Sequence, residues 1–156
     1  MIFVTVGTQI PFDRLIRMVD EIAPQLNGEE IIAQSCNGDY VPVNFKTEQF
    51  IPPARFEQIM NQARLIIAHA GTGSIVGAMQ RRKPIVVVPR KADLGEHRND
   101  HQLATAQYLA KTSSLCVANS AHELLQAVKN EPIPDPLPSA PSPQLISAIR
   151  NIIDNS

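Results

Sequence analysis

A run of small and polar residues, His69-Ala70-Gly71-Thr72-Gly73-Ser74, joins two apolar segments of this chain. It follows Leu65-Ile66-Ile67-Ala68 and precedes an amphipathic stretch over 75–82. A strand that breaks into glycines and then enters a helix directs several backbone N–H groups, with the positive end of the helix dipole, at one spot. The glycines allow close approach of a ligand, and the hydroxyls of Thr72 and Ser74 can donate to it. The pattern indicates a phosphate or diphosphate site; a tight turn in which Ser74 caps the helix is the alternative.

A second polar cluster, Gly95-Glu96-His97-Arg98-Asn99-Asp100-His101-Gln102, follows the apolar run Ile85–Pro89. Carboxylates and amides suit the hydroxyls of a sugar, while Arg98 or the imidazoles could face a phosphate. A polar loop that leads into a helix over 103–110, with Asn99 or Asp100 as its cap, is the alternative. We expect both clusters at the carboxyl edge of a sheet, where ligands of open α/β folds bind, and this favours the binding role.

Several other chemistries fit the spacing poorly. His97 and His101 are four residues apart, but Glu96 precedes the first histidine, so the zinc motif H-E-x-x-H is absent and we expect no metal. Residues 71–74 do not form the G-x-S-x-G turn of a serine hydrolase. The first apolar run ends in Gly7-Thr8-Gln9 rather than G-x-G-x-x-G, and no G-x-x-x-x-G-K-[ST] occurs. These absences disfavour zinc enzymes, hydrolases that use Ser74, dinucleotide dehydrogenases and P-loop proteins.

The elements that position these clusters alternate between strand and helix patterns. Stripes of apolar residues at helical spacing follow the first, third and fourth strand patterns, and Ser120-Ala121-His122-Glu123 is a capping box that opens a further helix. Such alternation predicts a single Rossmann-like α/β domain over 1–130, with a mostly parallel six-stranded sheet and helices on both faces. The strands are expected at Ile2–Val6, Glu30–Ser35, Asn44–Ile51, Leu65–Ala68, Ile85–Pro89 and Leu115–Ala118.

Prolines dominate the segment that follows this domain. Six of them lie between Glu131 and Pro143, which predicts an extended connector over 131–143. A C-terminal amphipathic helix is expected over 144–156, and it packs either on its own domain or on another chain. Its apolar stripe consists of Leu145, Ile146, Ile149, Ile152 and Ile153.

Composition excludes several classes of partner. The formal net charge is −1 and aromatic residues make up 4% of the chain, so binding of nucleic acid is not expected. Cys36 and Cys116 stand alone and indicate a reducing compartment. No apolar run approaches the roughly 20 residues of a membrane span, and the N-terminus lacks a signal-peptide pattern. The expected location is therefore cytoplasmic, with any membrane contact made through a partner.

Four motifs in this order resemble the carboxyl-terminal, donor-binding half of GT-B glycosyltransferases. The resemblance covers about residues 1 to 129 and is greatest to the small subunits that act with a membrane-bound partner. These include the catalytic subunit that adds the second N-acetylglucosamine to dolichol-diphosphate and, closest, the bacterial exopolysaccharide and capsule subunits. The motifs are Val4-Thr5-Val6-Gly7-Thr8 with Phe12-Asp13-Arg14-Leu15-Ile16, His69 to Ile75, Lys83-Pro84-Ile85-Val86-Val87-Val88-Pro89-Arg90, and Gly95 to Gln102.

This resemblance implies a subunit of an inverting, metal-independent UDP-sugar glycosyltransferase that uses no cofactor. By that resemblance His69, Gly71, Thr72, Gly73 and Ser74 would hold the diphosphate, and Gly7 and Thr8 would line the cleft. The sugar and ribose would face Glu96, Asn99, Asp100, His101 and Gln102, and His101 is the candidate general base.

A membrane-associated partner subunit would bind the lipid-linked acceptor and complete the catalytic cleft. One position departs from the family pattern. Relatives often carry a glutamate three residues beyond Ser74 that binds the ribose hydroxyls, and here that residue is Gly77. A glycine cannot make this contact, which keeps a second hypothesis open: a non-catalytic module that binds a nucleotide or a partner.

Overall fold

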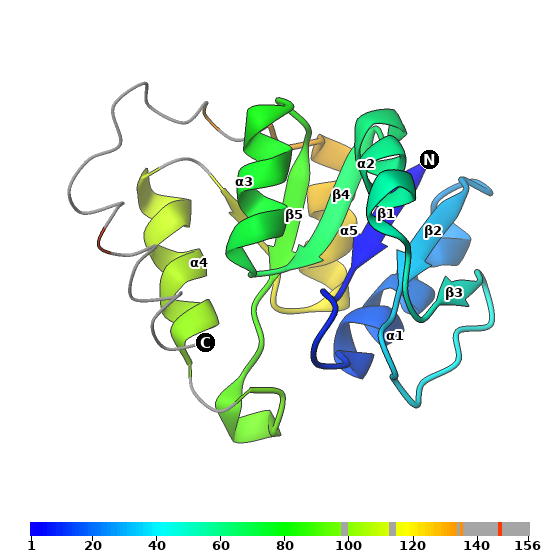
Figure 1. Ribbon diagram of the computed structural model, residues 1–156, viewed down its shortest axis with the longest axis horizontal. Helices are drawn as coiled ribbons and strands as arrows, with labels where there is room; N and C mark the ends of the chain where they lie inside the picture. The colour runs from blue at the N-terminus through cyan, green and yellow to red at the C-terminus, as the bar shows by residue number, and fades with distance from the viewer. Residues whose placement is uncertain (98–99, 113–114, 134, 136–146, 148–156) are drawn as a thin grey trace.

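Six parallel strands form one sheet in the order β3-β2-β1-β4-β5-β6 (Figure 1). The computed structural model describes all residues except 98–99, 113–114, 134, 136–146 and 148–156, and for residues 101, 102, 105, 110 and 112 it describes the backbone alone. The strands are β1 (Ile2–Thr5), β2 (Ile31–Gln34), β3 (Thr47–Glu48), β4 (Leu65–His69), β5 (Ile85–Val88) and β6 (Cys116–Val117). The expected α/β fold with a six-stranded sheet is confirmed, and every strand pair is parallel.

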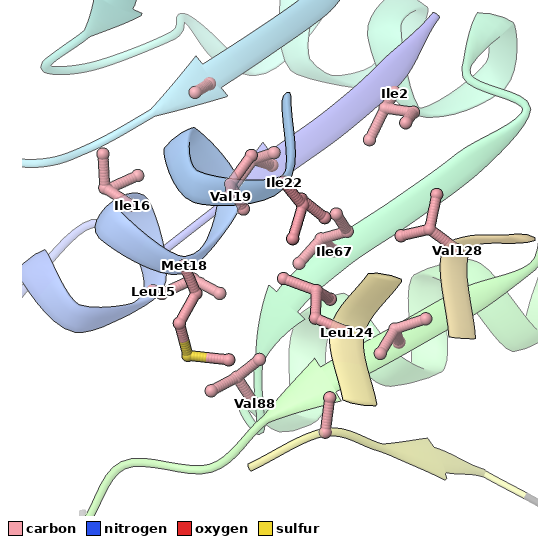
Figure 2. Close-up of a cluster of buried hydrophobic side chains, with 14 of the residues drawn as sticks. Ile2, Leu15, Ile16, Met18, Val19, Ile22, Ile67, Val88, Leu124 and Val128 are labelled. Atoms are coloured by element: carbon pink, nitrogen blue, oxygen red, sulfur yellow. The ribbon is translucent and has the colours of Figure 1, made fainter. Parts of the chain in front are cut away.

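Helices cover both faces of the sheet, as expected. They are α1 (Asp13–Ile22), α2 (Pro53–Gln62), α3 (Thr72–Gln80), α4 (His101–Thr112) and α5 (Ala121–Asn130), with short 3₁₀ turns η1 (Ala23–Gln25) and η2 (Ala92–Leu94). On one face α1 and α5 pack together over the sheet, and Leu15, Val19 and Leu124 belong to the same buried cluster as Ile67 and Val88 (Figure 2). The other face buries Ile66 and Val87 beneath α2, α3 and α4. Residues that alternate along one strand thus enter different cores, which explains the continuous apolar runs.

The third strand is much shorter than the predicted Asn44–Ile51. In the segment before it, the backbone N–H groups of Val43 and Asn44 donate to the buried carboxylate of Asp20 in α1, at 3.1 and 3.0 Å. At the other end, the N–H of Ile51 donates to the side-chain Oε1 of Gln34 at 2.8 Å instead of to a strand. Side chains therefore take the backbone groups that a longer strand would have paired.

Two further expectations concern the later part of the chain. The helix expected over 103–110 begins earlier, at His101, and extends to Thr112. The proline-rich connector over 131–143 and the C-terminal helix over 144–156 lie almost entirely outside the described residues. Of the connector's first residues, Pro132 contributes its carbonyl, which accepts the N–H of Ile85 at 3.1 Å. Among the helices that the structure describes, none is long and apolar enough to cross a membrane.

Candidate functional site

The strand order places two predicted site loops side by side. From β1 the chain moves outward to β2 and β3, then returns to β4 on the other side of β1 and continues to β5 and β6. The sheet order therefore reverses between β1 and β4, and in open α/β sheets ligands bind beside the carboxyl ends of the strands at such a switch point. Gly7 and Thr8 follow β1, and the loop His69–Ser74 follows β4. Two separate sequence motifs meet at the position where this fold binds ligands.

His69 joins these two loops. A β-carbon on Gly7 would lie 2.8 Å from Nε2 of His69, and one on Gly71 would lie 2.1 Å from its Cε1. Contacts this short would force the imidazole to move, so glycine at both positions allows the ring to pack closely against the two loops. Gly7 also has φ of +83°, a conformation that favours glycine. The sequence predicted a site residue at each of these positions but not that His69 packs against both glycines.

Helix α3 presents its N-terminus at the switch point. It begins at Thr72 with Gly71 as its N-cap, and no side chain caps it. The alternative in which Ser74 caps this helix is therefore wrong, since Ser74 lies within the first turn. The amides of Thr72, Gly73 and Ser74 lack backbone acceptors in the described part of the chain, as expected for the first turn of a helix. These donors and the helix dipole suit an anion.

The Thr72 side chain adds a further unused polar group. Its Oγ1 is buried and has no hydrogen-bond partner among the described residues. Gly73, by contrast, is exposed, and a β-carbon there would meet no atom within 4 Å. The first turn of α3 thus combines unused donors with open space beside Gly73.

The polar cluster after β5 is organised by an ion pair. Arg14 of α1 makes two hydrogen bonds to the Glu96 carboxylate, at 2.8 and 2.9 Å, and the same carboxylate accepts the Lys91 N–H at 3.0 Å. Arg14 also donates to the carbonyl of Pro89 at 2.8 Å. Glu96 therefore holds the loop after β5 against α1, and its predicted contact with sugar or ribose stays a prediction.

The structure describes the side chains of only some of the other residues in this cluster. Asp100 precedes α4, and its carboxylate accepts the N–H of Ala92 at 2.9 Å while its carbonyl accepts that of Ala104. Nδ1 of His97 is buried with no partner among the residues that the structure describes. Asn99 lies outside the described residues, and for His101 and Gln102 only the backbone, in the first turn of α4, is described. Their roles toward a sugar remain predictions.

Two buried polar residues that were not among the predicted site residues hold the backbone at this carboxyl edge of the sheet. Arg90, 2% exposed, donates to the carbonyls of Val6, Ile10 and Pro11 at 2.6 to 2.8 Å. Burial lowers the pKa of Arg90 to about 10, opposed by the charge of Glu96, so the guanidinium stays charged at neutral pH. The available signal was the position of Arg90, a charged residue immediately after the apolar run Ile85–Pro89.

Gln34 is a second buried residue of this kind. It is fully buried at the end of β2, where its Nε2 donates to the carbonyl of Gly7 at 3.0 Å. The available signal for Gln34 was a polar residue at the end of an apolar strand pattern.

Gly77 lies on α3 beside α2 and Arg81. A β-carbon there would lie 3.3 Å from Cε of Met60 and 3.5 Å from Nη1 of Arg81, which donates to the Gly77 carbonyl at 2.9 Å. A larger residue at 77 would need Met60 or Arg81 to move. Among the described residues, no three His, Cys, Asp or Glu side chains gather as metal ligands would.

Comparison with known proteins places this geometry in a family. Residues 1–152 match the glycosyltransferase family 28 C-terminal domain. The chain is 34% identical, over 123 residues, to the UDP-N-acetylglucosamine transferase subunit ALG13 of Mus musculus; the match covers 72% of this chain and 10% of that protein. The ALG13 subunit of Yarrowia lipolytica is 29% identical over 157 residues, covering 87% of this chain and 78% of that protein. The chain thus spans about a tenth of the length of its mammalian relatives.

Solved structures share the fold. The solution structure of ALG13 superposes with a TM-score of 0.60 at 20% identity, covering 98% of this chain and 94% of that one. The kitacinnamycin glycotransferase gives a TM-score of 0.61 at 16% identity, covering 97% of this chain but 37% of that one. Because the family match extends over nearly the whole chain and the mouse relative exceeds 30% identity, this chain belongs to the glycosyltransferase family 28 C-terminal domain family.

Proposed function

We propose that this chain is the donor-binding subunit of an inverting UDP-sugar glycosyltransferase that acts on a lipid-linked acceptor. Membership of family 28 supports sugar transfer as the reaction. The mouse and human relatives are named as subunits of a UDP-N-acetylglucosamine transferase, so UDP-N-acetylglucosamine is the donor to test first.

The observation that carries the proposal is the meeting of two glycine loops at the switch point between β1 and β4. Gly7 and Gly71 both pack on the ring of His69, and the uncapped first turn of α3 begins beside them. The amides of Thr72, Gly73 and Ser74 would bind the diphosphate of the donor. Three N–H groups and a helix dipole supply the positive field that many other transferases take from a metal ion, so the proposed binding needs no metal.

The reaction that follows is a displacement at the anomeric carbon. The acceptor hydroxyl oxygen forms the new bond to this carbon, the bond to the diphosphate oxygen breaks, and UDP leaves with the electron pair. A general base takes the hydroxyl proton. The N–H groups at the α3 N-terminus would stabilise the charge that develops on the leaving diphosphate. The sugar would face the segment Glu96–Gln102, with His101 as the candidate base if this chain supplies one.

A partner subunit belongs to the proposal. The relatives' names describe subunits, and the proposed donor site lies at one edge of a single sheet. We propose that a membrane-associated partner binds the acceptor, closes over this edge and brings the chain to the membrane. The C-terminal helix expected over 144–156 is the candidate segment for that contact.

A thermal-shift and calorimetry series on the purified chain tests donor binding. UDP and UDP-N-acetylglucosamine, with EDTA present, should each bind at one site; a ligand at 100 times its Kd stabilises the fold by about 2.7 kcal/mol, a rise in Tm of roughly 5–10 °C. NAD, as the control ligand, should give no shift. Failure of both uridine ligands to bind, or binding that disappears with EDTA, would contradict the proposal.

Gly77 favours one alternative, a nucleotide-binding module without catalysis. Its position on α3 offers no side chain to a ribose, and Met60 and Arg81 lie against it. In that case the chain would bind UDP, but the complex with its partner would transfer no sugar. Transfer of the radiolabelled sugar from UDP-N-acetylglucosamine to a lipid-linked acceptor by the complex would exclude this alternative.

A further inference from the structure

Arg90 connects the strand β5 to the loop that follows β1. The β1–α1 loop comprises residues 6–12, and the buried guanidinium of Arg90 binds three of its carbonyls. Nη1 donates to Pro11 at 2.7 Å, and Nη2 donates to Val6 at 2.8 Å and to Ile10 at 2.6 Å. Three carbonyls of one short loop therefore depend on a single planar cation.

The surroundings of Arg90 keep it in this position. Its guanidinium carbon lies 4.7 Å from the centre of the Phe12 ring, a cation–π arrangement with a buried aromatic residue. Arg14 lies 5.2 Å from the same ring and makes the two hydrogen bonds to Glu96 described above. Together these contacts clamp the β1–α1 loop to residues 89–96.

Two further donors bind the carbonyls of Gly7 and Thr8 in the same loop. Nε2 of Gln34 binds the carbonyl of Gly7, and Sγ of Cys36 lies 3.6 Å from that of Thr8. The carbonyls at 6, 7, 8, 10 and 11 are thus all engaged by side chains from outside the loop. Because a carbonyl and the following N–H share one peptide plane, fixing these carbonyls also fixes the loop amides.

We propose that Arg90 is a positioning residue for diphosphate binding: it sets the backbone of the β1–α1 loop so that Gly7 stays against His69, beside the first turn of α3. This inference rests on the proposed function. Arg90 is buried behind the loop and acts through Gly7 and His69 rather than on the ligand itself. The experiment must distinguish this role from a purely structural one, in which Arg90 stabilises the fold without affecting ligand binding.

The variant Arg90→Lys keeps the positive charge but loses the planar fork. An ammonium group is a single point, so it cannot reach three carbonyls that are now bound by two different guanidinium nitrogens. We expect hydrogen exchange of the Val6 and Gly7 amides, which donate to the Gln34 carbonyl and the Thr5 hydroxyl, to become about tenfold faster or more, while the strands keep their protection. UDP should bind about tenfold more weakly because the loop no longer holds its bound arrangement.

Arg64→Lys is the matched control. Arg64 also binds through its guanidinium fork, to Glu29, and it contacts Glu131, at the amino edge of the sheet opposite the switch point. Its replacement should change neither exchange in residues 6–12 nor UDP affinity. If Arg90→Lys does not fold, Arg14→Lys tests the same clamp with Arg90 intact.

The measurements are hydrogen exchange by mass spectrometry on the full unliganded chain and calorimetric titration with UDP in EDTA. Faster exchange confined to residues 6–12, together with weaker UDP binding, supports the inference. Unchanged exchange there, exchange raised equally throughout the chain, or wild-type UDP affinity in Arg90→Lys would each overturn it. A wild-type chain that does not bind UDP would instead overturn the proposed function, which keeps the two failures apart.

Discussion

His69 packs closely against two glycines of the neighbouring loops. Its ring packs against Gly7 and Gly71, which belong to loops on either side of the switch point. A β-carbon at either position would displace the ring, so a substitution in one loop should also disturb the histidine that contacts the other. The residues that we propose to contact the ligand are those of the first turn of α3, and two of them give sharp predictions.

Gly73→Val should abolish UDP binding and leave the fold intact. In the unliganded chain a β-carbon at this position meets no atom within 4 Å, so the new side chain fits, but it fills the space through which a phosphate reaches the helix N-terminus. Calorimetry measures the binding and thermal unfolding measures the stability. His122→Val is the control, because His122 is exposed at the same second position of α5. Both variants should lie within about 1 kcal/mol of the wild type in stability. Undiminished UDP affinity in Gly73→Val would move the site elsewhere.

Thr72→Val should weaken UDP binding while slightly stabilising the fold. The Thr72 hydroxyl is buried without a partner among the described residues, so its replacement by a methyl group should slightly raise Tm. If the hydroxyl donates to the diphosphate, UDP affinity should fall roughly 10- to 100-fold, since a hydrogen bond to a charged group contributes about 1.5–3 kcal/mol. Thr72→Ser keeps the hydroxyl and should retain most of the affinity. Equal UDP binding by the valine and serine variants would exclude this contact.

At the scale of elements, Asp20 links α1 to the segment before β3. Its carboxylate accepts the hydroxyl of Tyr40 at 2.7 Å and the N–H groups of Val43 and Asn44. Burial acts to raise the pKa of Asp20, but these hydrogen bonds together outweigh it, and the pKa is lowered. The charged form is thus more favourable in the folded chain than in the unfolded chain.

Asp20→Asn should destabilise the chain by about 2–4 kcal/mol. The asparagine NH₂ would face N–H and O–H groups that need an acceptor, and the negative charge would be lost. The expected fall in Tm is roughly 5–15 °C. Because the folded pKa of Asp20 lies below the unfolded value of about 3.9, its contribution is complete above that pH and is lost as the pH falls through the lowered folded pKa. Denaturant unfolding of both proteins between pH 7 and pH 2.5 measures this, and the difference between them should narrow below about pH 4. A difference independent of pH would show that the charge is not what stabilises this segment.

The elements themselves were largely predictable from local patterns. The expected ranges overlap all six strands, and Ser120 caps α5 as expected. Its Oγ accepts the Glu123 N–H at 3.2 Å, and the Glu123 carboxylate accepts the N–H of Asn119, one residue before the cap, at 2.8 Å. The third strand was overextended because the signal that ends it, the Asp20 carboxylate, lies more than 20 residues away. Local patterns contain no information about such a partner.

At the scale of the whole molecule, strand order was the missing information. The sequence located the glycine loop before α3 and the glycine after β1, but nothing local indicates that β1 and β4 are neighbours. The contact of His69 with Gly7 follows only from that adjacency. Arg90 donates to a carbonyl 84 positions away, and Glu96 is bound by an arginine 82 positions away. The polar composition around Glu96 indicated a ligand, whereas the fold also uses its carboxylate to hold two loops together.

The proposed partner gives a prediction at this same scale. Truncation after Ile133 should leave the chain folded and UDP affinity intact, since it keeps the Pro132 carbonyl that binds the Ile85 N–H. It should abolish co-purification with the partner if the expected helix over 144–156 makes that contact. Circular dichroism, calorimetry and affinity co-purification check the three parts. A truncated chain that unfolds would assign the helix to the core of this domain, and one that still binds the partner would place the interface elsewhere.

The proposed function places the diphosphate of a uridine donor at the first turn of α3, at the switch point between β1 and β4. Titration of UDP into the ¹⁵N-labelled 17.1 kDa chain, with EDTA present and backbone amides followed by NMR, tests the ligand and its location together. We expect saturable shifts that are largest for the amides of Gly71, Thr72, Gly73 and Ser74, with smaller ones at Gly7 and Thr8. The absence of saturable shifts, or shifts centred on the amino edge around Glu29 and Arg64, would contradict the proposed function.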